Sequence, residues 1–395
     1  MPHTLFSQYI LASGLAVALG YLWMRFQGGI SRRWRWPGAL LYVLMFAVAM
    51  APRFVSFGLN PLEKYLSLIS GFWIVVLSNW LVTCVAVDVF VAVVWINKRM
   101  LGLGGSAREI SHFLSRKRNA AMPLLAILVL LTSVAFWVYG YDHQLAFQRT
   151  EKTIHVAKPL AKPLRIAVFS DIHFGPLFEV SKFDRLLDTL NKIQPDMIFF
   201  LGDMTDLTSN ELDAVGLGDR INRMHAPLGV YGITGNHEGY TLGHDRHILD
   251  WMELHGIQLL RDESICLPQV CMTGRDDPAV SNEIGPPRKV FASIVPNLDE
   301  AAHKPWLVFD HQPFGLTPDD VNGLAQRPDL GISGHTHGGQ FFPWNFVIRL
   351  FWPLAQGFGV LDGVPWYVTS GFGQGGPAVR VGTNAEVLII DLVGK

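Results

Sequence analysis

Gly334-His335-Thr336-His337-Gly338-Gly339 places two histidines two residues apart between small residues, so that both imidazoles can point at one site. Four further clusters of acid, histidine or asparagine precede this stretch, and each follows a β-branched or aromatic run that predicts a strand. The clusters are Asp171-Ile172-His173, Gly202-Asp203, Gly235-Asn236-His237-Glu238 and Asp310-His311, after the runs Leu164–Ser170, Met197–Leu201, Val230–Thr234 and Trp306–Phe309. Polar clusters at the C-terminal ends of strands in an α/β pattern predict a ligand site outside those strand ends.

Length and composition divide the chain into two parts. Its 395 residues favour about two domains. Roughly the first 140 residues are rich in Leu, Val, Ala, Phe and Trp and almost free of acid, whereas the remainder has ordinary globular content. A net charge of -1, without a basic stripe interleaved with aromatics, argues against nucleic acid as a partner.

The apolar part predicts an all-α bundle of about four membrane-spanning helices. Each segment is near or above the roughly 18–20 residues that cross a bilayer core. Buried helices of a soluble protein are the alternative, but four such lengths without a polar face leave no surface for water. The first segment does not match a cleavable signal peptide, because its positive charges follow the apolar run. The segments are Leu5–Met24, Pro37–Phe54, one within Leu66–Ile96, and Pro123–Tyr141.

The charges between these segments predict their orientation. The first and third connections are basic, whereas the second carries only Arg53 and Lys64 against Glu63. Since basic connections stay in the cytoplasm, both chain ends should lie outside, with the C-terminal domain on the periplasmic or extracytoplasmic side of a bacterial inner or plasma membrane. Basic residues after the fourth segment, such as Arg149 and Lys152, are a counter-signal. The basic residues of the two connections are Arg25, Arg32, Arg33, Arg35, Lys98, Arg99, Arg108, Arg116, Lys117 and Arg118.

Two of the three cysteines bear on the compartment. Cys266 and Cys271 flank Leu267-Pro268-Gln269-Val270, and a two-residue turn at Pro268-Gln269 would set them opposite each other at disulfide distance. A disulfide would suit an oxidising compartment. Two buried free thiols remain the alternative, because proline there does not favour the usual hairpin turns.

The segment 142–163 carries charges and two prolines without an apolar period, which predicts a linker between the membrane helices of 1–141 and a domain of 164–395. Within that domain, helical spacing predicts helices, and two late apolar runs predict strands. The expected helices are Val180–Ile193, Asn210–Met224 and Ile248–His255, and the strands are Trp366–Ser370 and Glu386–Leu392.

Seven side chains form a candidate ligand set that mixes carboxylate, imidazole and amide oxygen. This mixture suits Mn, Fe, Zn, Co or Ni better than Mg or Ca. Seven ligands exceed one tetrahedral ion but fit two ions that share a carboxylate, an arrangement whose natural use is phosphoester hydrolysis by a bridging hydroxide. The set is Asp171, His173, Asp203, Asn236, His311, His335 and His337.

With these residues in place, residues 164–392 resemble the calcineurin-like metallophosphoesterase superfamily, and in particular its membrane-associated bacterial branch. The motifs that carry the resemblance are Ser170–His173, Gly202-Asp203, Gly235–Glu238 and Ser333–Gln340. It implies an α/β sandwich of two mixed sheets flanked by helices. It further implies a first metal on Asp171, His173 and His337, a second on Asn236, His311 and His335, and Asp203 as the bridge.

The same resemblance implies that His237 contacts the scissile phosphate and assists the leaving group, a role that a positioned imidazole can perform. Asp310, before His311, departs from the neutral residue common in the family and suggests a partner for that imidazole. Arg380 could reach a phosphate or form a structural ion pair, and His244 could contact substrate. Asp206 is either a partner of a ligand or the cap of a turn, and Gly338 and Gly339 would let backbone approach the metals.

The sequence therefore predicts a membrane-anchored phosphohydrolase, a phosphodiesterase or pyrophosphate hydrolase acting on a lipid or envelope phosphoester. Related membrane-associated members of the superfamily include hydrolases of lipid-linked pyrophosphates. The alternative is a transport or sensing protein with a regulatory, non-catalytic domain, although such a domain should have lost ligands. A scaffold that only binds phosphorylated partners is a third class, which substrate turnover would separate from the first.

Overall fold

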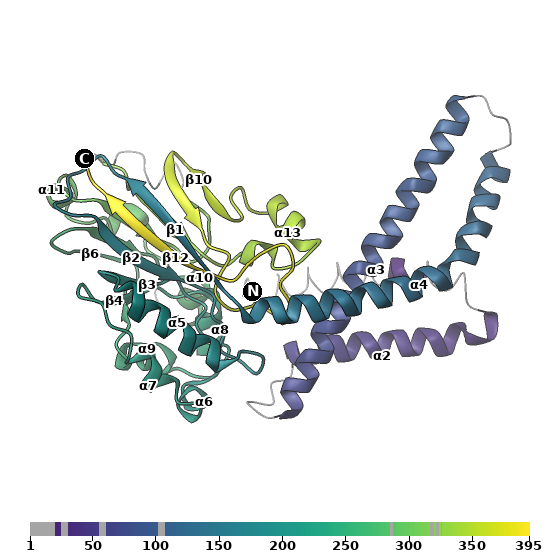
Figure 1. The fold of residues 1–395 in the computed structure, drawn as a ribbon, viewed down its shortest axis with the longest axis horizontal. Coiled ribbons are helices and arrows are strands. Elements are labelled where there is room, and N and C mark those ends of the chain that lie inside the picture. Colours follow the sequence, from purple (N-terminus) through teal and green to yellow (C-terminus); the bar gives the residue numbers. More distant parts are fainter. Residues whose placement is uncertain are drawn as a thin grey trace. The chain divides into compact units, whose positions relative to one another are not determined.

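The computed structural model describes residues 20–24, 31–54, 61–101, 107–284, 287–316, 320, 324 and 326–395. They divide into two compact units, one ending at Tyr139 and the other running from Gly140 to Lys395. Figure 1 shows the N-terminal unit as helices and the C-terminal unit as sheets with helices.

Long helices make up the N-terminal unit: α2 (Arg35–Phe54), α3 (Pro61–Met100) and α4 (Ala107–Leu145), preceded by the short η2 (Arg32–Trp34). The last residues of α4, from Gly140 on, belong to the C-terminal unit. Among the described residues, two segments are long and apolar enough to cross a membrane, Pro61–Met100 and Leu124–Leu145. They correspond to the third and fourth expected spans. The second expected span is helical as α2 but does not pass the same test, and the first lies outside the described residues except for 20–24. Two of the four expected spans are thus helices long and apolar enough to cross a membrane, by length and composition.

Two polar side chains that interrupt the apolar sequence of α3 bond to other helical segments. The Tyr21 hydroxyl donates to the Asp88 carboxylate at 2.5 Å, and the Asn79 amide donates to the Ser133 hydroxyl at 2.9 Å. Polar groups within membrane helices are commonly satisfied in this way. These contacts give Asp88 and Asn79 a role in helix packing.

Two six-stranded mixed sheets form the C-terminal unit, as expected from the sequence (Figure 1). In the first sheet only the β12–β2 pair is antiparallel, and in the second only the β10–β11 and β6–β7 pairs are. The first sheet has the order β1 (Gln148–His155), β12 (Glu386–Val393), β2 (Leu164–Phe169), β3 (Met197–Phe200), β4 (Val230–Gly232), β5 (Gln258–Leu259). The second has the order β10 (Gly357–Leu361), β11 (Val364–Val368), β9 (Leu330–Ser333), β8 (Trp306–Phe309), β7 (Cys271–Gly274), β6 (Glu263–Cys266).

Apolar side chains fill both faces of the central strands. On β2, Ile166 and Val168 join the core between the sheets, where the rings of Phe199 and Phe309 stack, while Ala167 and Phe169 join the core beneath the helices. This alternation follows from the two-residue period of a strand, and burial on both faces explains why the strands read as continuous apolar runs. The core between the sheets is what holds the two sets of strand ends together.

Helices cover the outer face of the first sheet. The helix α5 (Val180–Ile193) has the predicted bounds, and α9 (Ile248–Leu254) nearly so. The expected helix Asn210–Met224 is instead two short helices, α6 (Ser209–Ala214) and α7 (Leu217–Ile221), because Gly216 between them adopts a left-handed φ of 65°. The remaining short helices are α8 (Asn236–Leu242), α10 (Pro278–Ile284), η3 (Phe291–Ser293), α11 (Leu298–Ala301), η4 (His337–Gly339), α13 (Trp344–Val347) and η5 (Ile348–Leu350).

The segment expected to be a linker contributes a strand that the sequence does not predict. β1 pairs in parallel with β12 along all of Gln148–His155. It is an edge strand whose side chains are mostly exposed, so it lacks the apolar alternation by which strands are recognised. Its charged residues suit a sheet edge, where they discourage pairing with another chain.

Two basic side chains of α5 cap the C-terminal end of α4. The buried Lys182 ammonium donates to the carbonyls of Gln144 and Phe372, at 2.6 and 2.7 Å, and Arg185 donates to the carbonyl of Leu145 at 2.7 Å. The last carbonyls of a helix lack intrahelical partners and carry partial negative charge, so cations stabilise them. These contacts lie within the C-terminal unit, to which the last residues of α4 belong.

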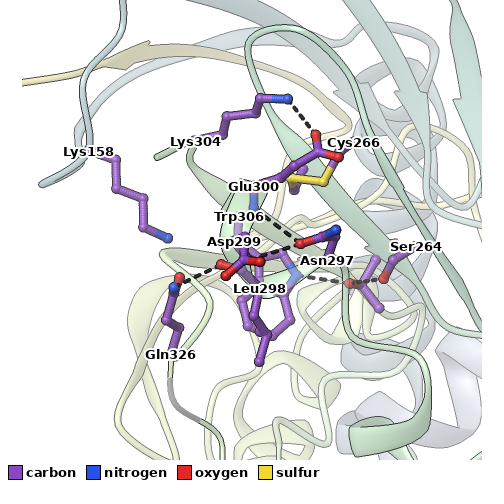
Figure 2. Close-up of a disulfide and its surroundings, with 12 residues drawn as sticks. Lys158, Ser264, Cys266, Asn297, Leu298, Asp299, Glu300, Lys304, Trp306 and Gln326 are labelled. Carbon is purple, nitrogen blue, oxygen red and sulfur yellow. Dashed lines mark hydrogen bonds and ion pairs between the residues drawn. A yellow bond between two sulfur atoms is a disulfide. The ribbon is translucent and has the colours of Figure 1, made fainter. Parts of the chain in front are cut away.

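The predicted cysteine hairpin is present and its cysteines are bonded. Cys266 and Cys271 are directly opposed on β6 and β7 and form a disulfide. Figure 2 shows the bond near α11, whose first turn is capped by Asn297. The bond resolves the two sequence alternatives in favour of the disulfide.

We expect the unfolded chain to show one titratable thiol without reductant, from Cys84, and three after reduction. Replacing Cys266 by Ser should lower the free energy of unfolding by about 2 kcal/mol, since the bridge closes only a short loop. Cys84→Ser is the control and should leave the Cys266–Cys271 bond intact. Three free thiols before reduction would contradict the disulfide.

Candidate metal centre

The seven candidate ligands lie just beyond five neighbouring strand ends. Asp171 and His173 follow β2, Asp203 follows β3, and Asn236 begins α8 after β4, all in the first sheet. His311 follows β8, and the two remaining histidines follow β9, in the second sheet. The sequence prediction that these clusters meet is therefore confirmed, with each sheet supplying part of the site.

One group of donors consists of Asp171, His173 and His337. The Nε2 atoms of His173 and His337 lie 3.1 Å apart, and His337 Nε2 lies 3.5 Å from Asp171 Oδ1. Facing ring nitrogens repel each other through their lone pairs unless a proton or a cation lies between them. The group can hold a metal ion.

The second group joins Asn236, His311 and His335. Asn236 Oδ1 lies 2.8 Å from His335 Nδ1 and 3.2 Å from His311 Nε2, and these two ring nitrogens are 3.3 Å apart. Amide oxygen with two imidazoles is a donor set for a borderline divalent metal.

Asp203 lies between the two groups. Its Oδ2 atom is 3.1 Å from His311 Nε2 and 3.7 Å from His173 Nε2, so one carboxylate oxygen reaches a member of each group. The Asp203 carboxylate thus connects the two groups of donors.

The backbone at these ligands is unusual. Among the described residues, nine non-glycine residues have positive φ, and five of them are candidate ligands. Left-handed conformations are costly for non-glycine residues and cluster at functional sites. The five are Asp171 (55°), His173 (50°), Asp203 (56°), His335 (71°) and His337 (49°).

The electrostatic environment keeps three candidate ligands in the form that binds a metal. Burial, reinforced by His311, lowers the pKa of His335 to about 3, and burial with His173 and Arg380 lowers the pKa of His337 well below its usual value. Burial alone would raise the pKa of Asp203, but the neighbouring histidines, His311 first, hold it well below its usual range. Neutral imidazole and ionised carboxylate are the ligand forms for divalent metals.

His237 stands at the exposed side of the cluster. Its side chain is 32% exposed, and its Nδ1 lies 2.5 Å from the carboxylate of Asp206. Burial would lower the pKa of His237, but Asp203 and Asp206 raise it to about 10. A protonated imidazole at the mouth of the site can donate a proton to a leaving group.

Asp206 also contacts a candidate ligand. Its Oδ1 lies 3.3 Å from His173 Nδ1, the nitrogen that faces away from the metal group, as well as close to His237. Of the two sequence interpretations, partner of a ligand and turn cap, the structure supports the first. A carboxylate behind a metal-binding histidine fixes its tautomer and orientation.

Glu238 is a functional residue to which the sequence analysis gave no role. Its buried carboxylate accepts hydrogen bonds from the backbone N–H groups of Asp203, Met204 and Gly235, at 2.8, 2.6 and 2.6 Å. It ties the loop after β3 to the loop after β4. Gly235 is required here because a Cβ would overlap the Asp203 carboxylate and lie 2.5 Å from its backbone nitrogen. The sequence signal for this role of Glu238 was its position three residues after Gly235, at the start of a helix.

The expected pairing of Asp310 with the His311 ring is wrong. His311 Nδ1 lies 2.7 Å from the Leu201 carbonyl and its Nε2 faces the cluster, so both ring nitrogens are used. Asp310 instead forms an ion pair with Arg288. The sequence around Asp310 does not reveal this contact, because Arg288 reaches it from another part of the chain.

Arg380 does not point at a substrate. It is fully buried, and its guanidinium donates to the carbonyls of Ser370, Gly371, Gly373 and Asn384. The predicted contact with phosphate is therefore wrong, and the alternative of a structural role holds, with carbonyls in place of an acid.

Two other sequence predictions concern His244 and the glycines Gly338 and Gly339. His244 is exposed on the turn after α8, and its contact with substrate stays a prediction. The close approaches at Gly338 and Gly339 are to the Gln356 side chain and the Trp344 backbone, rather than to the metal groups.

A two-sheet sandwich with polar donors at its strand ends defines a class of metal-dependent phosphoesterases, and comparison with known proteins agrees. Residues 164–339 match the calcineurin-like phosphoesterase family, so the chain carries a calcineurin-like metallophosphoesterase domain. An uncharacterized metallophosphoesterase of Campylobacter jejuni is 29% identical over 70% of this chain and 72% of its own length. A transmembrane protein with metallophosphoesterase domain from Danio rerio is 28% identical over 73% of this chain and 68% of its own length. An uncharacterized metallophosphoesterase of Aquifex aeolicus is 28% identical over 66% of this chain and 98% of its own.

Asp206→Asn should weaken metal binding about 10–100-fold, because the neutral amide no longer orients His173 as the carboxylate does. It should also lower the pKa of His237 by removing a neighbouring charge. Mn titration with metal analysis of the dialysed protein measures the first effect, and NMR titration of the imidazole the second. The exposed Asp219→Asn is the control; equal Mn affinity in the two variants would contradict the role given to Asp206.

Proposed function

We propose that the chain is a membrane-anchored phosphohydrolase that cleaves a phosphodiester or pyrophosphate bond of a lipid or envelope phosphoester. The observation that carries the proposal is the shared carboxylate of Asp203 between two groups of metal donors. Two divalent ions of Mn, Fe, Zn, Co or Ni bound there would supply positive charge to the phosphoryl oxygens and an activated water for in-line displacement.

The residues of the chain have separate parts in this reaction. Asp171, His173 and His337 would hold one ion and Asn236, His311 and His335 the other, with Asp203 between them. Asp206 orients His173 and His237 through one oxygen atom. His237, held as a cation by its acidic neighbours, would donate its proton to the departing oxygen.

The location of the domain is part of the proposal. The basic connections between the expected spans favour a bacterial inner or plasma membrane with the catalytic domain outside the cytoplasm. The Cys266–Cys271 disulfide supports this side, because structural disulfides persist in oxidising compartments. Four spans, two of them among the described helices, would anchor the domain.

The first test is hydrolysis of an aryl phosphodiester, with the monoester alongside, by the full chain purified in detergent, stripped of metal and reloaded with Mn. We expect turnover that depends on Mn and falls about 10²-fold or more in His337→Ala, since several kcal/mol of charge stabilisation depend on the ion. His303→Ala, an exposed histidine outside the cluster, is the control. Folded protein that fails to turn over either substrate with any of the five metals would refute the proposal.

The role of His237 predicts a dependence on the leaving group. His237→Gln should slow hydrolysis of an alkyl phosphodiester by about 10²–10⁴-fold but affect a nitrophenyl diester much less, since nitrophenolate leaves without a proton. The ratio of kcat/KM for the two substrates measures the effect. An equal loss on both substrates would assign His237 to binding and exclude proton donation.

A further inference from the structure

A largely exposed apolar segment begins four residues after the candidate ligand His337. Residues 341–352, which we call the aromatic segment, have the sequence FFPWNFVIRLFW and include α13 and η5 (Figure 1). Phe346 is 61% exposed, Leu350 82% and Phe351 73%. Side chains of this kind in one stretch mark an interaction surface, because water disfavours contiguous apolar area.

The composition of the aromatic segment suits the interface of a bilayer. It contains two tryptophans, four phenylalanines and one cation, Arg349, and no acid. Tryptophan and phenylalanine favour the boundary between headgroups and acyl chains, and arginine can bury its stem while its charge stays among the headgroups.

The aromatic segment adjoins the end of a candidate membrane helix. Arg380 N–H donates to the carbonyl of Gly140 in α4 at 3.0 Å, and a Cβ on Gly140 would lie 2.9 Å from the Val381 side chain. Val381 in turn bridges to Phe341, and its carbonyl accepts from the N–H of Phe342 at 3.2 Å. Val381 thus lies between Gly140 of α4 and Phe341, the first residue of the aromatic segment.

The other end of the aromatic segment reaches the metal cluster. The Trp352 ring contacts the candidate ligand His335, with centroids 5.4 Å apart, and the half-exposed Phe314, at 5.0 Å. The segment therefore runs from the membrane helix to the second metal group.

We propose that the aromatic segment inserts into the interfacial layer of the bilayer that holds α3 and α4, so that the metal cluster takes phosphoester headgroups of lipids in that bilayer. The substrate class rests on the proposed function, whereas the insertion does not. The insertion can therefore be tested without any turnover.

Insertion is tested with a fluorophore at Leu350, using the cysteine content of the chain. Cys266 and Cys271 are bonded, so Leu350→Cys in a Cys84→Ser background offers one thiol for an environment-sensitive NBD label. The full chain is reconstituted in vesicles of phosphatidylcholine and phosphatidylglycerol. Leu254→Cys, on α9 and 78% exposed, is the matched control.

At position 350 we expect blue-shifted emission, quenching by doxyl-labelled lipid and protection from aqueous iodide. At position 254 we expect emission without the blue shift, no quenching by doxyl-labelled lipid, and quenching by iodide. Iodide quenching at 350 equal to that at 254 would overturn the insertion. Protection from both quenchers at 350 would also overturn it, since the segment would then be covered by protein.

The substrate class is tested with Phe346→Ser/Leu350→Ser, which touches no candidate ligand. Turnover of a phospholipid diester in these vesicles should fall about tenfold or more, because each lost apolar anchor weakens partition by such a factor. Turnover of the soluble aryl diester should be unchanged. An unchanged ratio of the two activities would overturn the lipid assignment, whereas absence of aryl diester turnover in the unsubstituted chain would refute the proposed function and leave the NBD result standing.

Discussion

The crowding of ligand atoms around the Asp203 carboxylate is the constraint on which this domain depends. Ring nitrogens and carboxylate oxygens lie 3.1 to 3.7 Å from one another. Such a set is unfavourable by itself and becomes favourable around cations, since each donor loses its water on burial. The surrounding chain holds it against that cost. Glu238 binds three backbone N–H groups around Asp203, and the missing Cβ of Gly235 leaves room for the carboxylate.

The left-handed ligands are held in place by loops that bond to one another. The N–H of Asp171 donates to the carbonyl of Gly202, that of His173 to the carbonyl of Asp203, and that of Gly373 to the carbonyl of Asp171, so two loops fix one short turn. Backbone strain persists only where the neighbouring structure determines the conformation in this way. The loops come from both sheets, and the core between the sheets therefore sets the spacing of the metal groups.

The parts of this arrangement that local sequence determines were predictable, and the parts that distant contacts determine were not. The strands before Asp171, Asp203, Asn236 and His311 follow from apolar runs, and their polar successors follow from the rule for strand ends. β1 was missed because an exposed edge strand has no apolar period. Arg380 was misassigned because a lone arginine near the C-terminus reads as a phosphate ligand, whereas its carbonyl partners come together only in the folded loop. Asp206 could not be decided for the same reason, since its two histidine partners lie on other loops.

Residues 371–384 connect the last residues of α4, which belong to the C-terminal unit, to the loop of the candidate ligand Asp171. Lys182 donates both to the carbonyl of Phe372 and to that of Gln144 in the last turn of α4. Arg380 donates through its backbone N–H to the carbonyl of Gly140 in α4 and through its guanidinium to the carbonyl of Gly371, which lies beside Asp171. Asn384 meets His143 of α4 at 2.8 Å. A displacement of the helix end must therefore move the same loop that positions a metal ligand, or break several buried hydrogen bonds at about 1–3 kcal/mol each.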